Sequence, residues 1–241
     1  MIKEAIQYIV GLSAPSIHTI GDAIYSDKTL HRIKHNPHAD PIKMNTLSSL
    51  IDYIRSGVDD LPEKLIIHVQ SPTRVQMYSA LDYDRERECL AEVNALIPDF
   101  NFNQFTDHDK FCINLQSKCV DLGDRALLLK FAGTVEAGSV AEYGDDGISQ
   151  KATVKTGITT KTEALVPSPA LLAPYRTFIE IEQPVSTFIF RMQQDKYSGI
   201  QCALFEADGG AWKLVAVQSI KEYLASALQN LPDEMSFTIL S

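Results

Sequence analysis

Four acidic side chains have the residue types and surroundings of a metal site. Asp145 and Asp146 stand between two glycines in the string GDDG, and Glu206 and Asp208 lie in the string EADGG at the end of an apolar segment. Carboxylate oxygens are preferred ligands of hard divalent cations, so the four acids could hold a metal ion. An EF-hand loop, however, would need a glutamate at its twelfth position, where this chain has Thr156. Adjacent acids between glycines are more typical of a tight turn, and this interpretation is favoured for Asp145 and Asp146.

Two arginines in the C-terminal third could bind an anion. This part of the chain reads as two strands interrupted at Gln183-Pro184. If a turn of even length joins them, strand alternation places Arg176 opposite Arg191, with Glu180 on the same face. Facing guanidinium groups repel each other unless an acid or an anion lies between them. A glutamate partner or a shifted register is favoured, but the arginine pair would also suit a phosphate or carboxylate ligand.

Three histidines, His31, His35 and His38, follow one another at helical spacing. Such spacing places imidazoles on one face of a helix, as in some zinc sites. The Asn36-Pro37 pair disfavours a continuous helix, and no nearby acid completes a ligand set. The sequence therefore favours a solvated loop.

The four cysteines, Cys89, Cys112, Cys119 and Cys202, form neither a CxxC pair nor the spacing of a disulfide framework. Cys112 and Cys119 share a helical face with Leu115, which is typical of small buried hydrophobic residues. Reduced thiols in a cytoplasmic protein are the default expectation. A catalytic cysteine would additionally need a neighbouring base and a group that orients this base.

The composition disfavours several classes of protein. The 241 residues carry a formal net charge of −9, which argues against a surface that binds phosphate backbones, so nucleic acid is not an expected partner. No apolar segment approaches the roughly 18 residues of a membrane-spanning helix, and the chain is predicted to be soluble. The P-loop, the dinucleotide-binding glycine motif, the nucleophile elbow and the HExxH zinc motif are all missing. No cofactor is therefore expected.

The elements of the N-terminal half can be outlined from apolar spacing and end signals. The predictions are an amphipathic helix over residues 2–12, two short strands around Gly21-Asp22, a helix between the N-cap Thr46 and Gly57, two strands over 64–81 that meet at Ser71-Pro72, a helix over 84–96, and a helix after a capping box formed by Thr106 and Asp109.

The expected fold class is α+β, an antiparallel sheet with packed helices. Residues 175–241 give the clearest signals, with three strands, a helix and a closing strand. Residues 140–174 are rich in glycine, threonine, lysine and proline, and their apolar periodicity is weak, so they are predicted to form an extended connecting loop. Residues 1–139 would form an N-terminal α+β part, and all three parts could belong to one domain.

Three strings in the second half carry a resemblance to a known family. They are DDGISQ, PSPALLAPYRTFIEIEQPVSTFIFRM and ALFEADGGAWKLVAVQSIKEYL. The chain resembles proteins carried by phages and prophages of bacteria, and in particular the YfdQ-like family of unknown function, from the LIDYI helix to the final helix. The resemblance implies an early or accessory phage protein in the host cytoplasm, and it supplies no catalytic residues.

Four functions are compatible with these observations. The leading hypothesis is a non-enzymatic phage accessory protein that self-associates and acts as an interaction module, because exposed sheet edges invite pairing and because the segment 140–174 could wrap around a neighbour. The second is an anion-binding protein that sequesters a nucleotide signal, using the two arginines and Glu180. The third is a metal-dependent enzyme that uses the four acids, and the fourth is an accessory protein of DNA replication or recombination. Besides a second copy of the chain, a small anionic ligand or a host or phage protein is the expected partner.

Overall fold

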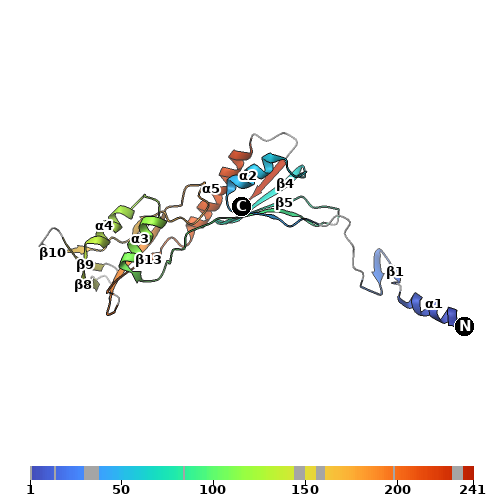
Figure 1. The fold of residues 1–241 in the computed structure, drawn as a ribbon, viewed down its shortest axis with the longest axis horizontal. Helices are drawn as coiled ribbons and strands as arrows, with labels where there is room; N and C mark the ends of the chain where they lie inside the picture. The colour runs from blue at the N-terminus through green and yellow to red at the C-terminus, as the bar shows by residue number, and fades with distance from the viewer. Residues whose placement is uncertain are drawn as a thin grey trace. The chain divides into compact units, whose positions relative to one another are not determined.

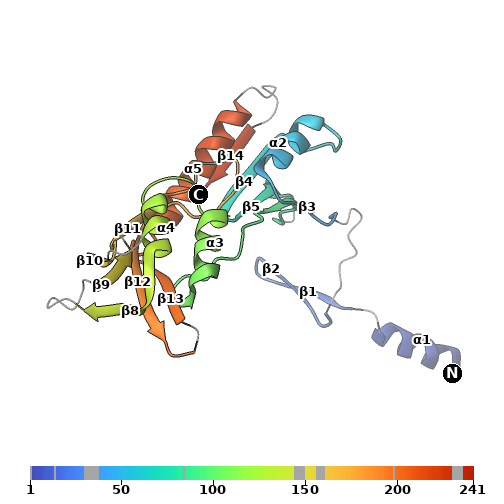
Figure 2. The ribbon, with the colours of Figure 1, turned by 60° about the vertical axis from the view of Figure 1, so that its left-hand side comes forward.

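The chain has an α+β fold, as the sequence predicts. The computed structural model describes residues 2–13, 15–29, 38–83, 85–143, 150–155, 161–197, 199–229 and 236–241. The chain divides into two compact units, Met1–Ala39 and Asp40–Ser241, and most of their elements are labelled in Figure 1 and Figure 2. Among the helices of the described ranges, none combines the length and the apolar character needed to cross a membrane.

The N-terminal unit consists of a helix and a hairpin, both of which the sequence predicts. The helix is α1 (Ile2–Ser13), and β1 (Ile17–Ile20) pairs antiparallel with β2 (Ala23–Ser26) around a turn at Gly21-Asp22. Every described side chain of these three elements is exposed. Their described residues therefore form no buried core.

The first core of the larger unit lies between a five-stranded sheet and two helices. The strand order is β14 (Ser236–Leu240), β4 (Lys64–Ser71), β5 (Arg74–Ser79), β6 (Cys89–Asn94) and β3 (Ile42–Met44). The outer strands β14 and β3 run parallel to their neighbours, and the inner pairs are antiparallel. Helices α2 (Leu47–Ser56) and α5 (Ala211–Leu228) pack on one face of this sheet (Figure 2). Leu65, Ile67 and Val69 of β4 point into the core at every second position, as expected of a strand buried on one face.

Helix α2 shows how the local sequence sets the ends of an element. Thr46 Oγ1 accepts a hydrogen bond from Ser49 N at 3.2 Å, which satisfies one of the free amide groups of the first turn. The helix ends at Gly57, whose φ of 59° is left-handed and favours glycine. Both predicted ends are confirmed.

The second core lies between a four-stranded antiparallel sheet and the helices α3 (His108–Lys118) and α4 (Arg125–Thr134). The strand order is β11 (Ala170–Leu172), β12 (Ser186–Asp195), β13 (Gly199–Glu206) and β7 (Thr106–Asp107). Phe190 of β12 is buried against Phe111 of α3, with ring centroids 5.4 Å apart. The predicted capping box is wrong in one respect, since Asp107 and not Thr106 caps α3. Its Oδ1 accepts hydrogen bonds from the amides of the second and third helical residues, at 3.0 and 3.2 Å.

Residues 85–96 form no helix, contrary to the sequence prediction for 84–96. Strand β6 lies in this segment, between β5 and β3 in the first sheet. Ala91 and Val93 are completely buried, whereas Glu92 between them is only half-buried. Pairing on both sides and this alternation outweigh the helix propensity of the segment.

The predicted loop over residues 140–174 is wrong for the described residues, because it contains strands. The strands β10 (Lys161–Leu165), β9 (Gln150–Lys155) and β8 (Val135–Tyr143) form an antiparallel sheet in this order, and β11 also lies in the segment. The side chain of Gln150 links this sheet to β12, since its amide donates to Met192 O at 3.0 Å and accepts from Met192 N at 3.1 Å. Backbone pairing thus supports strands that lack strong apolar periodicity.

The elements after residue 175 contribute to both cores. Strands β12 and β13 belong to the second core, whereas α5 and β14 pack in the first. The boundary between the two compact units of the chain lies after Ala39, and the division at residues 139 and 174 stays a prediction.

Candidate functional site

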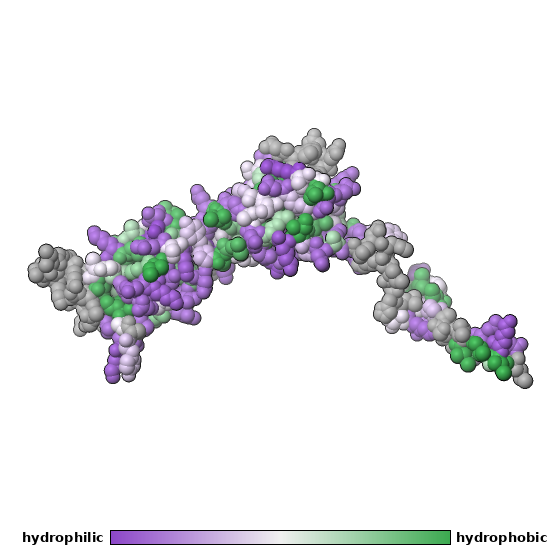
Figure 3. Space-filling view, viewed as in Figure 1, coloured by the Kyte–Doolittle hydropathy of each residue, from purple (hydrophilic) through white to green (hydrophobic). Residues whose placement is uncertain are grey.

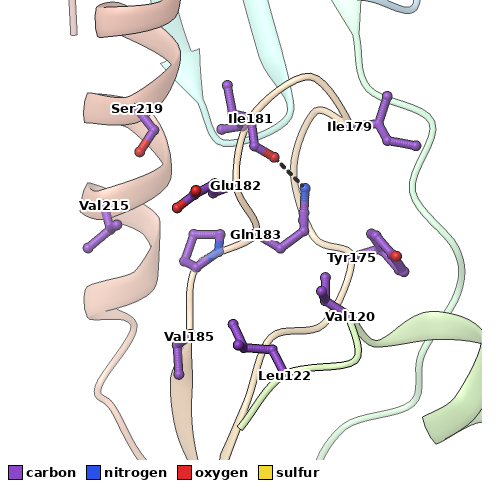
Figure 4. A pocket seen from close by; sticks show the side chains of 11 residues that line it. Val120, Leu122, Tyr175, Ile179, Ile181, Glu182, Gln183, Val185, Val215 and Ser219 are labelled. Carbon is purple, nitrogen blue, oxygen red and sulfur yellow. Dashed lines mark hydrogen bonds between the residues drawn. The ribbon is translucent and has the colours of Figure 1, made fainter.

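The segment that connects β11 to β12 is a loop around one buried glutamine, and not the predicted strand. Gln183 Oε1 accepts hydrogen bonds from the amides of Arg176 and Thr177, at 2.9 and 3.2 Å. Its Nε2 donates to Phe178 O at 3.0 Å and to Ile181 O at 3.3 Å, and Figure 4 shows the second of these bonds. A single side chain thus satisfies backbone groups that a paired strand would otherwise satisfy.

Arg176 anchors this loop to two other elements. Its Nη1 donates to Glu206 Oε1 of β13 at 2.7 Å, and its Nη2 donates to Ser186 Oγ. The guanidinium carbon lies 4.0 Å from the centroid of the Trp212 ring of α5, a favourable cation–π distance. Burial lowers the pKa of Arg176, although the charge of Glu206 acts in the opposite direction. The arginine is a buried tertiary contact between loop, strand and helix.

The two arginines do not face each other, and Arg176 has a glutamate partner instead, Glu206. Arg191 lies on β12 opposite Ala203 of β13, and its Nη1 lies 3.4 Å from Ser168 Oγ. Arg176 cannot face it across a strand pair because its segment forms no strand. The geometry that motivated an anion site is therefore missing, and a ligand-binding role for either residue stays a prediction.

Glu180 lies at the start of helix α2 and neutralises neither arginine. Its Oε1 accepts hydrogen bonds from Ser48 N at 3.2 Å and from Ser48 Oγ at 3.3 Å. A carboxylate is stabilising there because the first turn of a helix has free amide groups and a partial positive charge. Glu180 thereby ties the loop to the first core.

The described acids of the predicted metal site make structural contacts. The residues Asp145, Asp146, His31 and His35 lie outside the described ranges. Glu206 pairs with Arg176, as given above. Asp208 accepts hydrogen bonds from Gly210 N at 3.0 Å and from Trp212 N at 3.3 Å, at the start of α5. Burial raises the pKa of Asp208, but these two bonds, a hydrogen bond with the Ser186 side chain and the nearby charge of Arg176 together lower it below its ordinary value, so the carboxylate is held in its charged form.

The structure also brings a cysteine, a histidine and an aspartate together. Cys112 Sγ lies 3.8 Å from His108 Nε2, and His108 Nδ1 lies 3.0 Å from Asp109 Oδ1. The same Nε2 lies 3.0 Å from the backbone oxygen of Ala132 in α4. A carbonyl oxygen only accepts, so this nitrogen carries a proton and cannot take one from the thiol. Burial, and then the charge of Asp109, raise the pKa of Cys112. His108 therefore connects α3 with α4, and the trio is not arranged to activate a nucleophile.

An open groove lies beside the loop and is lined mostly by apolar side chains (Figure 4). This apolar groove has a volume of about 750 Å³ and is formed by the loop, the segment after α3 and one side of α5. Leu122, Ile179, Val185 and Val215 line it. Ile179 is 78% exposed and Val215 is 53% exposed, which is a high exposure for apolar side chains on neighbouring elements.

Sequence reasoning missed this groove because it placed Ile179 in a strand and Val185 in the turn after it. One signal was available in helix α5. Its buried stripe consists of Ala216, Ile220, Leu224 and Leu228 at spacings of four, and Val215 lies outside this stripe. An apolar residue off the core face of an amphipathic helix indicates a second contact surface.

Comparisons with known proteins add no family to this description. Searches against protein families, curated proteins and solved structures found no match. The resemblance to the YfdQ-like family is therefore carried by the sequence strings alone and stays a prediction.

Proposed function

We propose that the protein is a non-enzymatic interaction module that self-associates through its N-terminal unit. The observation that carries this proposal is the apolar face of helix α1. Ile2, Ile6 and Ile9 are 80%, 56% and 64% exposed, and their spacing places them on one face of the helix. Figure 3 shows hydrophobic residues gathered along one side of α1 and hydrophilic residues along the other. The hairpin adds the exposed side chains of Ile17, Ile20 and Ile24.

Elements of this size need a surface to bind. An isolated helix shorter than about 12–15 residues is marginal in water, and α1 has 12 residues. A single two-stranded hairpin is marginal as well. The stabilising free energy must come from burial of the apolar face, at roughly 25 cal/mol per Å². A second copy of the chain is the partner that is present wherever the protein is present.

The contacts of the described side chains that could do chemistry support a non-enzymatic role. Glu206 and Asp208 are engaged with Arg176 and with the start of α5, and the geometry around Cys112 leaves no free base. The resemblance to the YfdQ-like family supports the remaining part of the proposal, an accessory phage protein that works in the cytoplasm of the host.

The association can be tested by light scattering on three full-length proteins. We expect the wild type to have a mass above that of one chain and Ile6→Glu to be monomeric. A charge buried without a partner costs several kcal/mol, so the dissociation constant should rise at least about 100-fold. Gln7→Glu is the matched control, because Gln7 lies on the polar face of α1 and should associate like the wild type.

Two results would contradict the proposal. One is a wild-type protein that is monomeric at every concentration. The other is an unchanged mass for Ile6→Glu, which would place any association surface outside α1.

A further inference from the structure

We infer that the apolar groove beside residues 175–185 binds helix α1 of a second copy of the chain. This inference rests on the proposed function and names the surface that receives the N-terminal unit. Each copy carries one helix α1 and one apolar groove, so the contact joins two different surfaces and is heterologous.

The helix has the residue pattern of a groove ligand. Amphipathic helices that bind grooves present apolar anchors at positions i, i+4 and i+7. Ile2, Ile6 and Ile9 have this spacing, and all three are exposed. At 1.5 Å per residue, the helix is about 18 Å long, so three anchors along one face can enter a single groove.

The groove is preformed on its loop side. Ile179 stands between the backbone groups that Gln183 binds, and the flanking side chains of Phe178 and Ile181 are buried in the first core. An exposed apolar side chain on such a fixed backbone loses little conformational freedom when a partner covers it. On the opposite side, Val215 and Ser219 lie one turn apart on α5, as Figure 4 shows. The volume of about 750 Å³ is that of a cleft that encloses several side chains.

The charges of helix α1 and of the groove lining are complementary. Glu182 is the charged residue of the groove lining. On α1, Lys3 follows Ile2 at the edge of the apolar face, whereas Glu4 lies on the far side of the helix. A lysine at the rim of a buried apolar contact favours an acidic partner and helps to fix orientation.

A heterologous contact predicts a particular kind of assembly. Two-fold pairing of α1 with α1 would give a closed dimer. Insertion of α1 into the groove of another copy leaves one free helix and one free groove on every dimer, so further copies add until a ring closes or a filament grows. Masses above that of a dimer are therefore expected as the concentration rises.

The decisive experiment mixes two full-length double variants. The helix variant carries Ile6→Asp and Ile9→Asp, and the groove variant carries Ile179→Asp and Val215→Asp. All four side chains are exposed, so the fold should be kept, which circular dichroism and thermal melting would verify. Each variant alone should be monomeric, but their mixture should give a one-to-one complex in native mass spectrometry, because one retains the helix and the other the groove.

The control variant is Leu127→Asp. Leu127 is 52% exposed on α4 and does not line the groove, so this variant should associate like the wild type. Loss of association in this control would show a general effect of added charge and would overturn the assignment of the groove.

The remaining outcomes separate the inference from the proposed function. If the groove variant associates like the wild type while the helix variant is monomeric, the groove is excluded but association through α1 stands. If both variants are monomeric and their mixture gives no complex, the inference is likewise overturned. If the helix variant still associates, the proposed function fails and the inference fails with it.

Discussion

At the scale of single residues, buried polar side chains hold the loop that forms the groove. Gln183 is 8% exposed and binds four backbone groups of the loop. Arg176 is 5% exposed and connects the loop with β13 and α5. Both residues gain their roles from partners that a strand pattern does not predict.

Arg176 should be far more important for stability than Arg191. Arg176→Ala removes an ion pair and a stacked guanidinium from a buried position and leaves Glu206 without its partner, so the free energy of unfolding should fall by about 2–4 kcal/mol. Arg191→Ala is the control at a half-buried position and should cost about 1 kcal/mol or less. Urea denaturation of both variants measures the difference. Equal losses would contradict the role assigned to Arg176.

At the scale of elements, the connection between α3 and α4 is fixed against strand β11. Asp124 N donates to Leu171 O at 2.8 Å, and Asp124 Oδ2 accepts from Leu171 N at 2.8 Å. Gly123 precedes this contact with a φ of 63°, and a Cβ at this position would collide with the backbone oxygen of Leu171. Gly57, with a φ of 59°, has open space around it instead.

These two glycines allow a matched comparison. Gly57→Ala should lower the free energy of unfolding by about 1 kcal/mol, because only the left-handed conformation is strained. Gly123→Ala carries the same strain and a backbone clash as well, so the loss should exceed about 3 kcal/mol. Thermal or urea unfolding would measure both. Similar losses would show that the backbone at Leu171 moves away without cost.

At the scale of the whole molecule, buried thiol and phenol groups in both cores make the free energy of unfolding depend on pH. Burial raises the pKa of Cys119 to about 11 and that of Cys202 to about 12, in the second core. Burial, followed by the 2.7 Å hydrogen bond to Asp59, raises the pKa of Tyr53 to about 12 in the first core. The folded protein therefore holds these protons more tightly than the unfolded chain.

The stability of the larger unit should decrease in alkali. Below the ordinary thiol pKa of 9.0 both states are protonated, and these groups cause no pH dependence. Above it the unfolded chain releases protons first, so the free energy of unfolding falls as the pH rises towards the folded values. Urea titrations at a series of pH values measure this fall, and Cys202→Ala should make it shallower. A free energy that stays constant from about pH 8 to about pH 11 would contradict the shifts.

Elements whose signals are local could be predicted from the order of residue types alone. The apolar spacing of α1, α2 and α5, the cap at Thr46, the stop at Gly57 and the turn at Ser71-Pro72 all act within a few residues. Together these elements define the α+β class. The candidate association helix was also visible, because an apolar face at helical spacing needs no tertiary information.

The placement of the site depends on contacts between segments that are far apart in the chain. Strand β6 forms because strands on both sides pair with it, although its composition favours a helix. The loop at residues 175–185 takes its shape from contacts with remote segments, such as Glu180 with Ser48 and Thr177 with Pro72. Such partners lie more than a hundred residues apart in the chain. Their pairing depends on how two cores pack, and no local pattern of residue types contains that information.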